Sequence, residues 1–344
     1  MMEDDVTSLC KCIVWDLDNT VWDGICLEGN VVPRPDALEA ISTLHGRGIL
    51  HSVASRGEAA VALEMLKQQE LLGYFLVPKI NWLPKSTNIQ EISTMLNIPL
   101  DAIAFIDDDP FERAQVGFML PEVRVFPAES AAQLPALPGF DPTTVSDVAQ
   151  QRARLYREEL ERKAAEPAFA NREEFLQSCD MRLSVRRAVS ADLPRVQEMM
   201  SRTHQMNSTG LLLSEAELRE TIGVNTKELF VAELQDRFGS CGIIGILLMD
   251  TLAEEWRMLL FAMSCRVMGR GVEKAVLFAL TERYRPAGLT GMTALLRETD
   301  RNRMMRTMFQ MSGYRQWDRQ EDGSIIFKLA DSHDLTLPRW VRLV

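Results

Sequence analysis

Short apolar runs alternate with helical patterns over the first part of the chain. Three apolar runs, 12–16, 49–54 and 102–106, have the length of buried strands. The segments between them space their apolar residues as helices do, at 35–46, 57–71 and 86–96. Strands that alternate with helices predict a parallel sheet with right-handed crossovers. Functional groups of such sheets lie just past the carboxyl ends of the strands.

A different pattern begins near residue 181. The Pro-rich stretch 126–142 ends the first unit, and the polar stretch 144–178 favours a solvated connecting helix. Strands are then expected at 228–234, 241–249, 257–264, 291–296 and 324–329, and helices at 270–284 and 301–311. We therefore expect an α/β domain over 1–140, a helical linker over 141–180 and a mixed α/β domain over 181–344.

Composition places the chain among ordinary globular proteins. Of the 344 residues, 46% are hydrophobic and 25% charged. No apolar run reaches the roughly 18 residues that span a bilayer, and the acidic start lacks the pattern of a signal peptide. The six cysteines show no zinc-type spacing. These features predict a cytoplasmic protein with free thiols and no membrane partner.

Charge is spread unevenly along the chain. Residues 1–140 hold 9 Lys and Arg against 20 Asp and Glu, a net charge of −11, and the remainder holds 29 of each. An acidic first domain argues against nucleic acid and fits cation binding. Residues 261–320 hold 11 basic against 5 acidic residues, a net charge of +6. This segment could meet an anionic group or an acidic partner.

Polar residues follow the predicted strands of the first domain, and one precedes its third helix. They are Asp16, Asp18 and Thr20 after the first strand, Ser55 after the second, Lys85 before the helix, and Asp107 and Asp108 after the next strand. Taken singly, each could be a cap, a turn or a surface residue. Carboxylates that converge on one point favour Mg²⁺. One carboxylate can then attack phosphorus while another transfers a proton.

The order of these residues resembles the haloacid dehalogenase (HAD) superfamily. Asp16-Leu17-Asp18-Asn19-Thr20 matches its first motif, and Ser55, Lys85 and the pair Asp107-Asp108 match the later three. The resemblance implies Asp16 as nucleophile and Asp18 as acid and base. It further implies a Mg²⁺ site made by Asp16, Asp18, Asp107 and Asp108, and a phosphate site made by Thr20, Ser55, Arg56 and Lys85.

The surrounding sequence resembles the FkbH-like subfamily more narrowly. The segments that carry this resemblance are LDNTVWDG, SVASRGE, PKSTNIQEI and FIDDDPFERAQV. It implies a substrate, 1,3-bisphosphoglycerate, and a partner, an acyl carrier protein of polyketide biosynthesis that receives a glyceryl thioester. Asp23 departs from the family pattern, in which a small residue is expected there.

The spacing of the motifs leaves no room for a cap domain. Between Thr20 and Ser55 lie 34 residues, and between Ser55 and Lys85 lie 29. A strand and a helix use most of each interval. An open site favours a macromolecular substrate, or closure by a neighbouring domain or partner.

A second candidate site lies in the late basic segment. Arg266-Val267-Met268-Gly269-Arg270-Gly271 opens a helix and resembles the pyrophosphate loop of GNAT acetyltransferases. The resemblance implies that Arg266, Gly269, Arg270 and Gly271 bind the phosphate of a carrier protein's phosphopantetheine arm. A plain glycine turn is the alternative reading.

Two further residues are candidates for thiol chemistry. His204 could act as a base for a thiol, or it could be a polar loop residue. Cys26 could carry the acyl group as a thioester, or it could be an incidental buried thiol. The leading hypothesis is thus a glyceryl transferase and phosphatase. The alternatives are a capless phosphatase for a phosphorylated protein or metabolite, a carrier-protein scaffold with a silent site, and an N-acyltransferase that uses acetyl coenzyme A.

Overall fold

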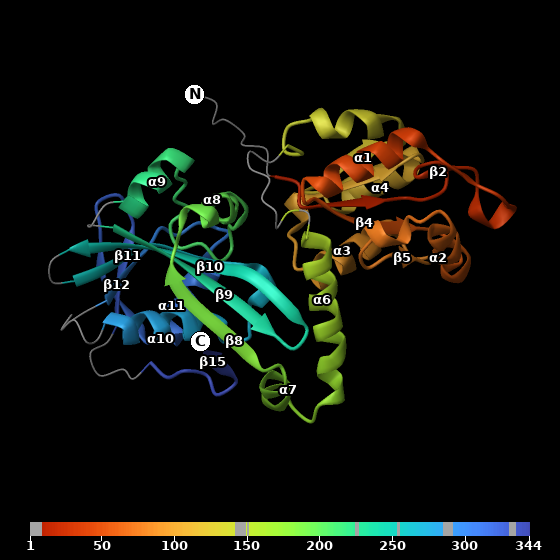
Figure 1. The fold of residues 1–344 in the computed structure, drawn as a ribbon. Helices are drawn as coiled ribbons and strands as arrows, with labels where there is room; N and C mark the ends of the chain where they lie inside the picture. Colours follow the sequence, from red (N-terminus) through yellow and green to blue (C-terminus); the bar gives the residue numbers. More distant parts are fainter. Residues whose placement is uncertain are drawn as a thin grey trace. The chain divides into compact units, whose positions relative to one another are not determined.

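The chain folds into two compact units that divide between Leu160 and Glu161 (Figure 1). The computed structural model describes residues 9–141, 149, 151–223, 227–252, 255–284, 292–329 and 335–344. None of the described helices is long and apolar enough to cross a membrane. The expected helical linker falls partly outside this range, because residues 142–148 and 150 are not described.

A parallel sheet forms the centre of the first unit. Its strand order is β5 (Lys79–Ile80), β4 (Leu50–Ser55), β1 (Cys12–Trp15), β6 (Ile103–Asp107) and β7 (Arg124–Pro127). Every neighbouring pair is parallel. The three strands expected from the sequence are the central ones, and the two missed strands lie at the edges, where short strands carry little apolar signal.

Helices cover both faces of this sheet. Along β1, Ile13 and Trp15 enter one core, while Cys12 and Val14 enter the other. The first core contains α1 (Pro35–Gly46) and α2 (Ala59–Gln68), and the second contains α3 (Lys85–Leu96) and α4 (Pro110–Met119). Because neither face of the central strand β1 meets water, this strand is apolar along its whole length instead of alternating.

Only a small insertion follows β1. The hairpin of β2 (Trp22–Asp23) and β3 (Val32–Pro33) encloses the single turn η1 (Cys26–Glu28). The other short helical turns of the unit are η2 (Leu72–Tyr74), η3 (Leu100–Ala102) and η4 (Ala128–Ala136). Residues 21–54 and 56–84 are all described, and neither interval contains a cap domain.

A mixed eight-stranded sheet forms the second unit. The strand order is β13 (Tyr314–Arg319), β14 (Ile325–Leu329), β12 (Met292–Leu296), β11 (Glu255–Met263), β10 (Gly239–Leu252), β9 (Lys227–Asp236), β8 (Met181–Arg187) and β15 (Val341–Leu343). Neighbours are antiparallel except for β11 with β12 and β8 with β15.

The helices of the second unit also contribute to two cores. One core contains α7 (Arg172–Ser178), α10 (Val272–Tyr284) and α11 (Arg303–Met311), and the other contains α8 (Leu193–Arg202) and α9 (Glu215–Gly223). Short turns lie at η5 (Glu166–Ala168), η6 (Ser190–Asp192) and η7 (Cys265–Val267). The expected α/β class is confirmed: a parallel sheet without a large cap is followed by a separate mixed α/β unit.

The helix α6 (Arg152–Ala165) contains the division between the units. Near its start, Arg152 Nη1 donates to the carbonyl of Gly48 over 2.9 Å. Near its end, Arg162 donates from Nε and Nη2 to both carboxylate oxygens of Asp236, at 2.8 and 2.9 Å. Both side chains of that ion pair are buried. The helix is therefore anchored within each unit by interactions of its own.

Candidate active site

Two aspartates come together at the carboxyl edge of the parallel sheet. Trp15 and Ile106 are in register on adjacent strands, so Asp16 and Asp107 follow side by side. Lys85, the first residue of α3, places Nζ 2.9 Å from Asp16 Oδ1 and 2.6 Å from Asp107 Oδ2. All three side chains are buried. A buried ammonium thus bridges two carboxylates that burial and mutual repulsion would otherwise destabilise.

The electrostatics of this group favour a cation. Burial, with the charge of Asp16, raises the pKa of Asp107 to about 7 against the opposing effect of Lys85. Burial likewise raises the pKa of Asp16, although Lys85 and a hydrogen bond with Ser55 lower it. Burial by itself lowers the pKa of Lys85, but the two carboxylates outweigh burial and raise it. One lysine does not neutralise the carboxylates fully, so further positive charge would stabilise the site.

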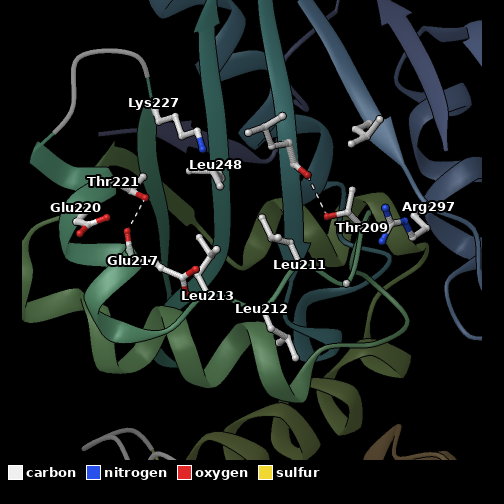
Figure 2. A pocket seen from close by; sticks show the side chains of 13 residues that line it. Thr209, Leu211, Leu212, Leu213, Glu217, Glu220, Thr221, Lys227, Leu248 and Arg297 are labelled. Carbon is white, nitrogen blue, oxygen red and sulfur yellow. Dashed lines mark hydrogen bonds between the residues drawn. The ribbon is translucent and has the colours of Figure 1, made fainter. Parts of the chain in front are cut away.

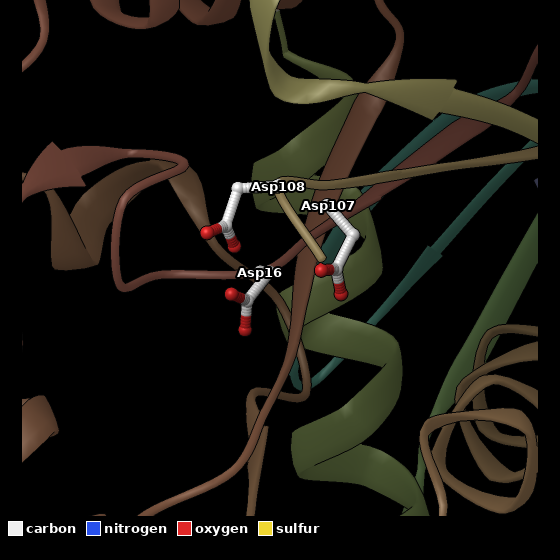
Figure 3. Close-up of side chains that lie close together, drawn as sticks. All are labelled: Asp16, Asp107 and Asp108. Carbon is white, nitrogen blue, oxygen red and sulfur yellow. The ribbon is translucent and has the colours of Figure 1, made fainter. Parts of the chain in front are cut away.

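Three carboxylates fit a divalent cation. Asp16, Asp107 and Asp108 each offer an oxygen within 4.8 Å of the others, and Figure 3 shows the three side chains close together. Thr20 accepts a hydrogen bond from the backbone N–H of Asp108 at 3.1 Å, which fixes the loop after β6. Hard carboxylate oxygens are the ligands that Mg²⁺ prefers. The donor set therefore suits Mg²⁺.

Asp18 is held by groups from the hairpin that follows it. Its Oδ1 accepts from Trp22 Nε1 at 2.8 Å and from the backbone N–H of Cys26 at 3.0 Å. Asn19, which directly follows Asp18, has a φ of 54°, in the left-handed region that asparagine tolerates. The chain therefore turns tightly after Asp18, toward the hairpin. The sequence did not predict the hydrogen bond from Trp22 to Asp18, because a tryptophan in an apolar segment indicates only a core residue.

The thiol of Cys26 is in an unfavourable state for nucleophilic attack. Its side chain is buried, and burial together with the charge of Asp18 raises its pKa. Attack requires the thiolate, which such surroundings suppress. Asp23, the residue that departs from the family pattern, is exposed in β2.

Ser55 ends β4 beside these groups, and Arg56 follows it directly. The Ser55 side chain hydrogen-bonds to Asp16. Arg56 donates from Nε to Glu112 Oε1 over 2.6 Å. Glu112 lies in the first turn of α4 and was missed, because an acidic residue there reads as an ordinary helix-start residue.

The predicted phosphate loop of the second unit lies between η7 and α10. Gly269 and Gly271 have φ values of 74° and 73°, so both positions favour glycine. A Cβ on Gly269 would lie 3.1 Å from Arg172 Nη2, which donates to the carbonyl of Gly269. The two glycines are therefore explained by backbone conformation and close packing.

The arginines of that loop face different surroundings. Arg270 is buried, its Nη2 donates to the carbonyl of Arg266 at 2.8 Å, and burial lowers its pKa to about 10. Its guanidinium is thus turned into the unit, contrary to the expected contact with an external phosphate. Arg266 is half-buried, with Nη2 3.5 Å from the carbonyl of Cys241.

A cavity of about 510 Å³ adjoins the loop. Its lining is rich in methionine and includes Met206, Met268, Gly269, Gly271, Glu273, Lys274, Met304, Thr307, Met308, Met311 and Ser312. Glu273 stands in the first turn of α10, and burial raises its pKa. Methionine-lined surfaces adapt to varied apolar ligands, whereas a carboxyl group at this helix start works against an anion.

His204 lies in a loop that continues into the sheet of the second unit. The strands β11 and β12 pair only over Trp256–Met258. Farther along β11, Asn207 forms an antiparallel bridge with Ala262, and the N–H of Ser208 donates to the carbonyl of Phe261 at 2.9 Å. The loop thus fills the space where the two strands separate. His204 itself is half-buried and belongs to the second unit, whereas Asp16 belongs to the first.

A larger cavity, of about 720 Å³, lies farther along the same loop (Figure 2). Six leucines line it, together with Thr209, Gly210, Glu217, Glu220, Thr221, Lys227 and Arg297. Figure 2 shows the Thr209 hydroxyl bonded to a strand carbonyl, that of Leu259, at 3.0 Å. The sequence did not predict this cavity, because its lining comes from segments far apart along the chain.

Parts of the chain are similar to solved structures. The N-terminal part of protein BF1531 from Bacteroides fragilis, which contains a phosphatase domain complexed with Mg, is 32% identical. That match covers 38% of this chain and 38% of that chain, with a TM-score of 0.32. The chain therefore corresponds to well under two thirds of that structure.

Two N-acetyltransferase structures also match less than half of the chain. The ribosomal-protein-S18-alanine N-acetyltransferase from Escherichia coli is 15% identical, covering 44% of this chain and 96% of that one, with a TM-score of 0.34. PaiA N-acetyltransferase from Thermoplasma acidophilum, in complex with coenzyme A, is 13% identical, covering 42% and 97%, with a TM-score of 0.35. No protein-family model and no curated protein matches the chain.

Proposed function

We propose that the first unit is a Mg²⁺-dependent phosphoryl transferase in which Asp16 is the nucleophile. The observation that carries this proposal is the buried Lys85 between Asp16 and Asp107, at the carboxyl edge of a parallel sheet. A surface ion pair would not require three ionisable side chains to be buried together. Perturbed and buried titratable groups at a sheet edge are typical of catalytic sites.

Under this proposal, four side chains have separate roles in the reaction. Asp16 attacks the phosphorus of a monoester, and the bond from phosphorus to the substrate oxygen breaks. Asp18 donates its proton to that oxygen and then accepts one from the water that hydrolyses the aspartyl-phosphate. Among the described residues no donor contacts Asp18 Oδ2, so that oxygen is open to carry the proton. Lys85 and Ser55 stabilise the phosphoryl oxygens.

A magnesium ion would be held by Asp16, Asp107 and Asp108. When bound, it supplies positive charge for the phosphoryl oxygens and for the carboxylates themselves.

The more specific proposal is a glyceryl transferase and phosphatase. The thiol of a carrier protein's phosphopantetheine arm attacks the acyl carbon of 1,3-bisphosphoglycerate, and the bond to the acyl phosphate breaks. The remaining 3-phosphate is removed at Asp16. The resemblance of residues 11–128 to the FkbH-like subfamily and the uncapped site support this reading. The buried Cys26 favours direct transfer to the carrier thiol over an enzyme thioester.

A capless phosphatase is the second candidate. The residues proposed for phosphoryl transfer lie together in the first unit, and this supports a phosphatase. The candidate acyl carrier, Cys26, is buried with a raised pKa. Removal of phosphate from a protein or metabolite would need only these phosphoryl-transfer residues and no acyl carrier. The intact set of Asp16, Ser55, Lys85 and Asp107 also argues against a silent scaffold.

One experiment separates these functions. A carrier protein is incubated with the full chain, Mg²⁺ and 1,3-bisphosphoglycerate, and its mass is measured. A glyceryl adduct supports the specific proposal, a phosphoglyceryl adduct indicates transfer without hydrolysis, and release of phosphate with no adduct favours the phosphatase. Asp16→Asn should abolish dephosphorylation, while the matched exposed variant Asp23→Asn should retain it. An unchanged rate in Asp16→Asn would refute the assignment of the nucleophile.

A further inference from the structure

Arg56 differs from the other cations on the loops around the site. Lys85 contacts both Asp16 and Asp107, and Arg113 donates from Nη1 to the carbonyls of Asp107 and Asp108 at 2.8 and 2.7 Å. Arg56 bonds to Glu112 through Nε alone. Among the described residues no acceptor contacts its two terminal nitrogens, and its side chain is 39% exposed. Its Nη groups therefore face solvent beside a site that handles phosphate.

Burial of Glu112, the partner of Arg56, is energetically unfavourable. The Glu112 side chain is only 7% exposed, and within the described structure its Oε2 is buried with no hydrogen-bond partner. Burying a carboxylate with one oxygen unsatisfied is unfavourable, and native proteins keep few such groups. Glu112 thus fixes one edge of the Arg56 guanidinium and leaves the other edge directed outward.

The pair also joins two loops of the site. Arg56 directly follows Ser55, which hydrogen-bonds to Asp16. Glu112 stands in the first turn of α4, shortly after Asp107. The position of Arg56 is therefore set by the same loops that set the phosphoryl site. A planar guanidinium with a free edge is suited to bind a carboxylate or phosphate through two parallel hydrogen bonds.

We propose that Arg56, positioned by Glu112, binds a second anionic group of the substrate, so that the site selects small phosphate esters that also carry a carboxylate or a second phosphate. This inference rests on the proposed phosphoryl-transfer function and specifies its substrate class. Arg56 confers specificity, and Glu112 is a positioning residue that acts through Arg56.

Two ligands that differ only in the second anionic group provide the test. 3-Phosphoglycerate has a carboxylate where glycerol 3-phosphate has a neutral hydroxymethyl group. Binding of each is measured by calorimetry in the full chain carrying Asp16→Asn, with Mg²⁺ present, so that turnover does not interfere. We expect 3-phosphoglycerate to bind about 10- to 100-fold more tightly, as one charge-assisted pair allows. Arg56→Gln should abolish the preference, and Lys67→Gln, an exposed cation of α2, should preserve it.

The variants of Glu112 test positioning. In the chain with Asp16 intact, Glu112→Ala should raise KM for 3-phosphoglycerate with little change in kcat, and Glu112→Gln, which can still accept from Nε, should restore much of the loss. Equal affinity for the two ligands before any change at Arg56, or a preference that survives Arg56→Gln, overturns the inference. Hydrolysis of phosphate esters by the unmodified chain is measured in a separate assay. If no hydrolysis occurs, the proposed function is overturned, independently of the result for Arg56.

Discussion

The substitution Lys85→Met removes the ammonium that bridges Asp16 and Asp107. Methionine keeps much of the aliphatic volume of the lysine but leaves two buried carboxylates without their shared partner. Removing one member of a buried ion pair costs about 3–5 kcal/mol of unfolding free energy, because the remaining charge stays desolvated. We expect a loss of this size for the metal-free protein at pH 8.

The loss should depend on pH in a defined direction. The pKa of Asp107 is already raised to about 7, and without Lys85 both carboxyl pKa values rise further. A raised carboxyl pKa means that the folded protein holds a proton which the unfolded chain releases. The stability that this bound proton contributes is fully present below about pH 4, the ordinary carboxyl pKa. It is lost as pH rises from there through the raised pKa of the folded protein. Each such proton changes the unfolding free energy by about 1.4 kcal/mol per pH unit within that window.

Urea denaturation in EDTA at pH 5 and pH 8 measures both effects. Lys79→Met is the matched control, since Lys79 pairs with Glu91 at 2.6 Å on the surface, where an ion pair contributes about 0.2–1 kcal/mol. Lys85→Met should cost several times more than Lys79→Met at pH 8, and the gap should narrow at pH 5. Equal costs for the two variants, or a gap that does not change with pH, would refute the reasoning.

Further predictions concern charge and packing. Asp107→Asn removes a like charge beside Asp16, so in EDTA at pH 8 it should raise the urea midpoint and reduce the thermal stabilisation by Mg²⁺; an unchanged midpoint would contradict this. Arg162→Ala leaves Asp236 buried without its bidentate partner and should lower the unfolding free energy by about 3–5 kcal/mol in urea denaturation; a loss under about 1 kcal/mol would contradict the buried-pair argument. Gly117→Ala, with no atom within 4 Å of the new Cβ in α4, should gain about 0.5–1 kcal/mol. Gly245→Ala, whose Cβ would lie 2.6 Å from a methionine sulfur, should lose about 1–3 kcal/mol, and reversed signs for the two glycine variants would overturn this packing argument.

The positions around the site show how far sequence patterns reach. Each of Asp16, Ser55 and Asp107 directly follows or ends an apolar run, and parallel strands end at one edge of a sheet, so their proximity follows from the pattern. The bond of Asp18 to Trp22 and the pairing of Arg56 with Glu112 do not. Trp22 and Glu112 stand where tryptophan and glutamate usually have structural roles. The residues next to them in the sequence do not indicate which distant side chain each one contacts.

The sequence by itself determined the three central strands of the first unit, the helices α1, α2 and α3 between them, and the residues proposed to carry its chemistry. These depend on local hydrophobic periodicity and on which residues follow each strand. Only the tertiary structure decided the burial of Cys26 and the inward turn of Arg270, since burial depends on which distant segments pack over a side chain. It also decided that Lys85 bridges two carboxylates, because that contact joins elements separated by 22 and 69 residues and is set by how α3 packs against the sheet.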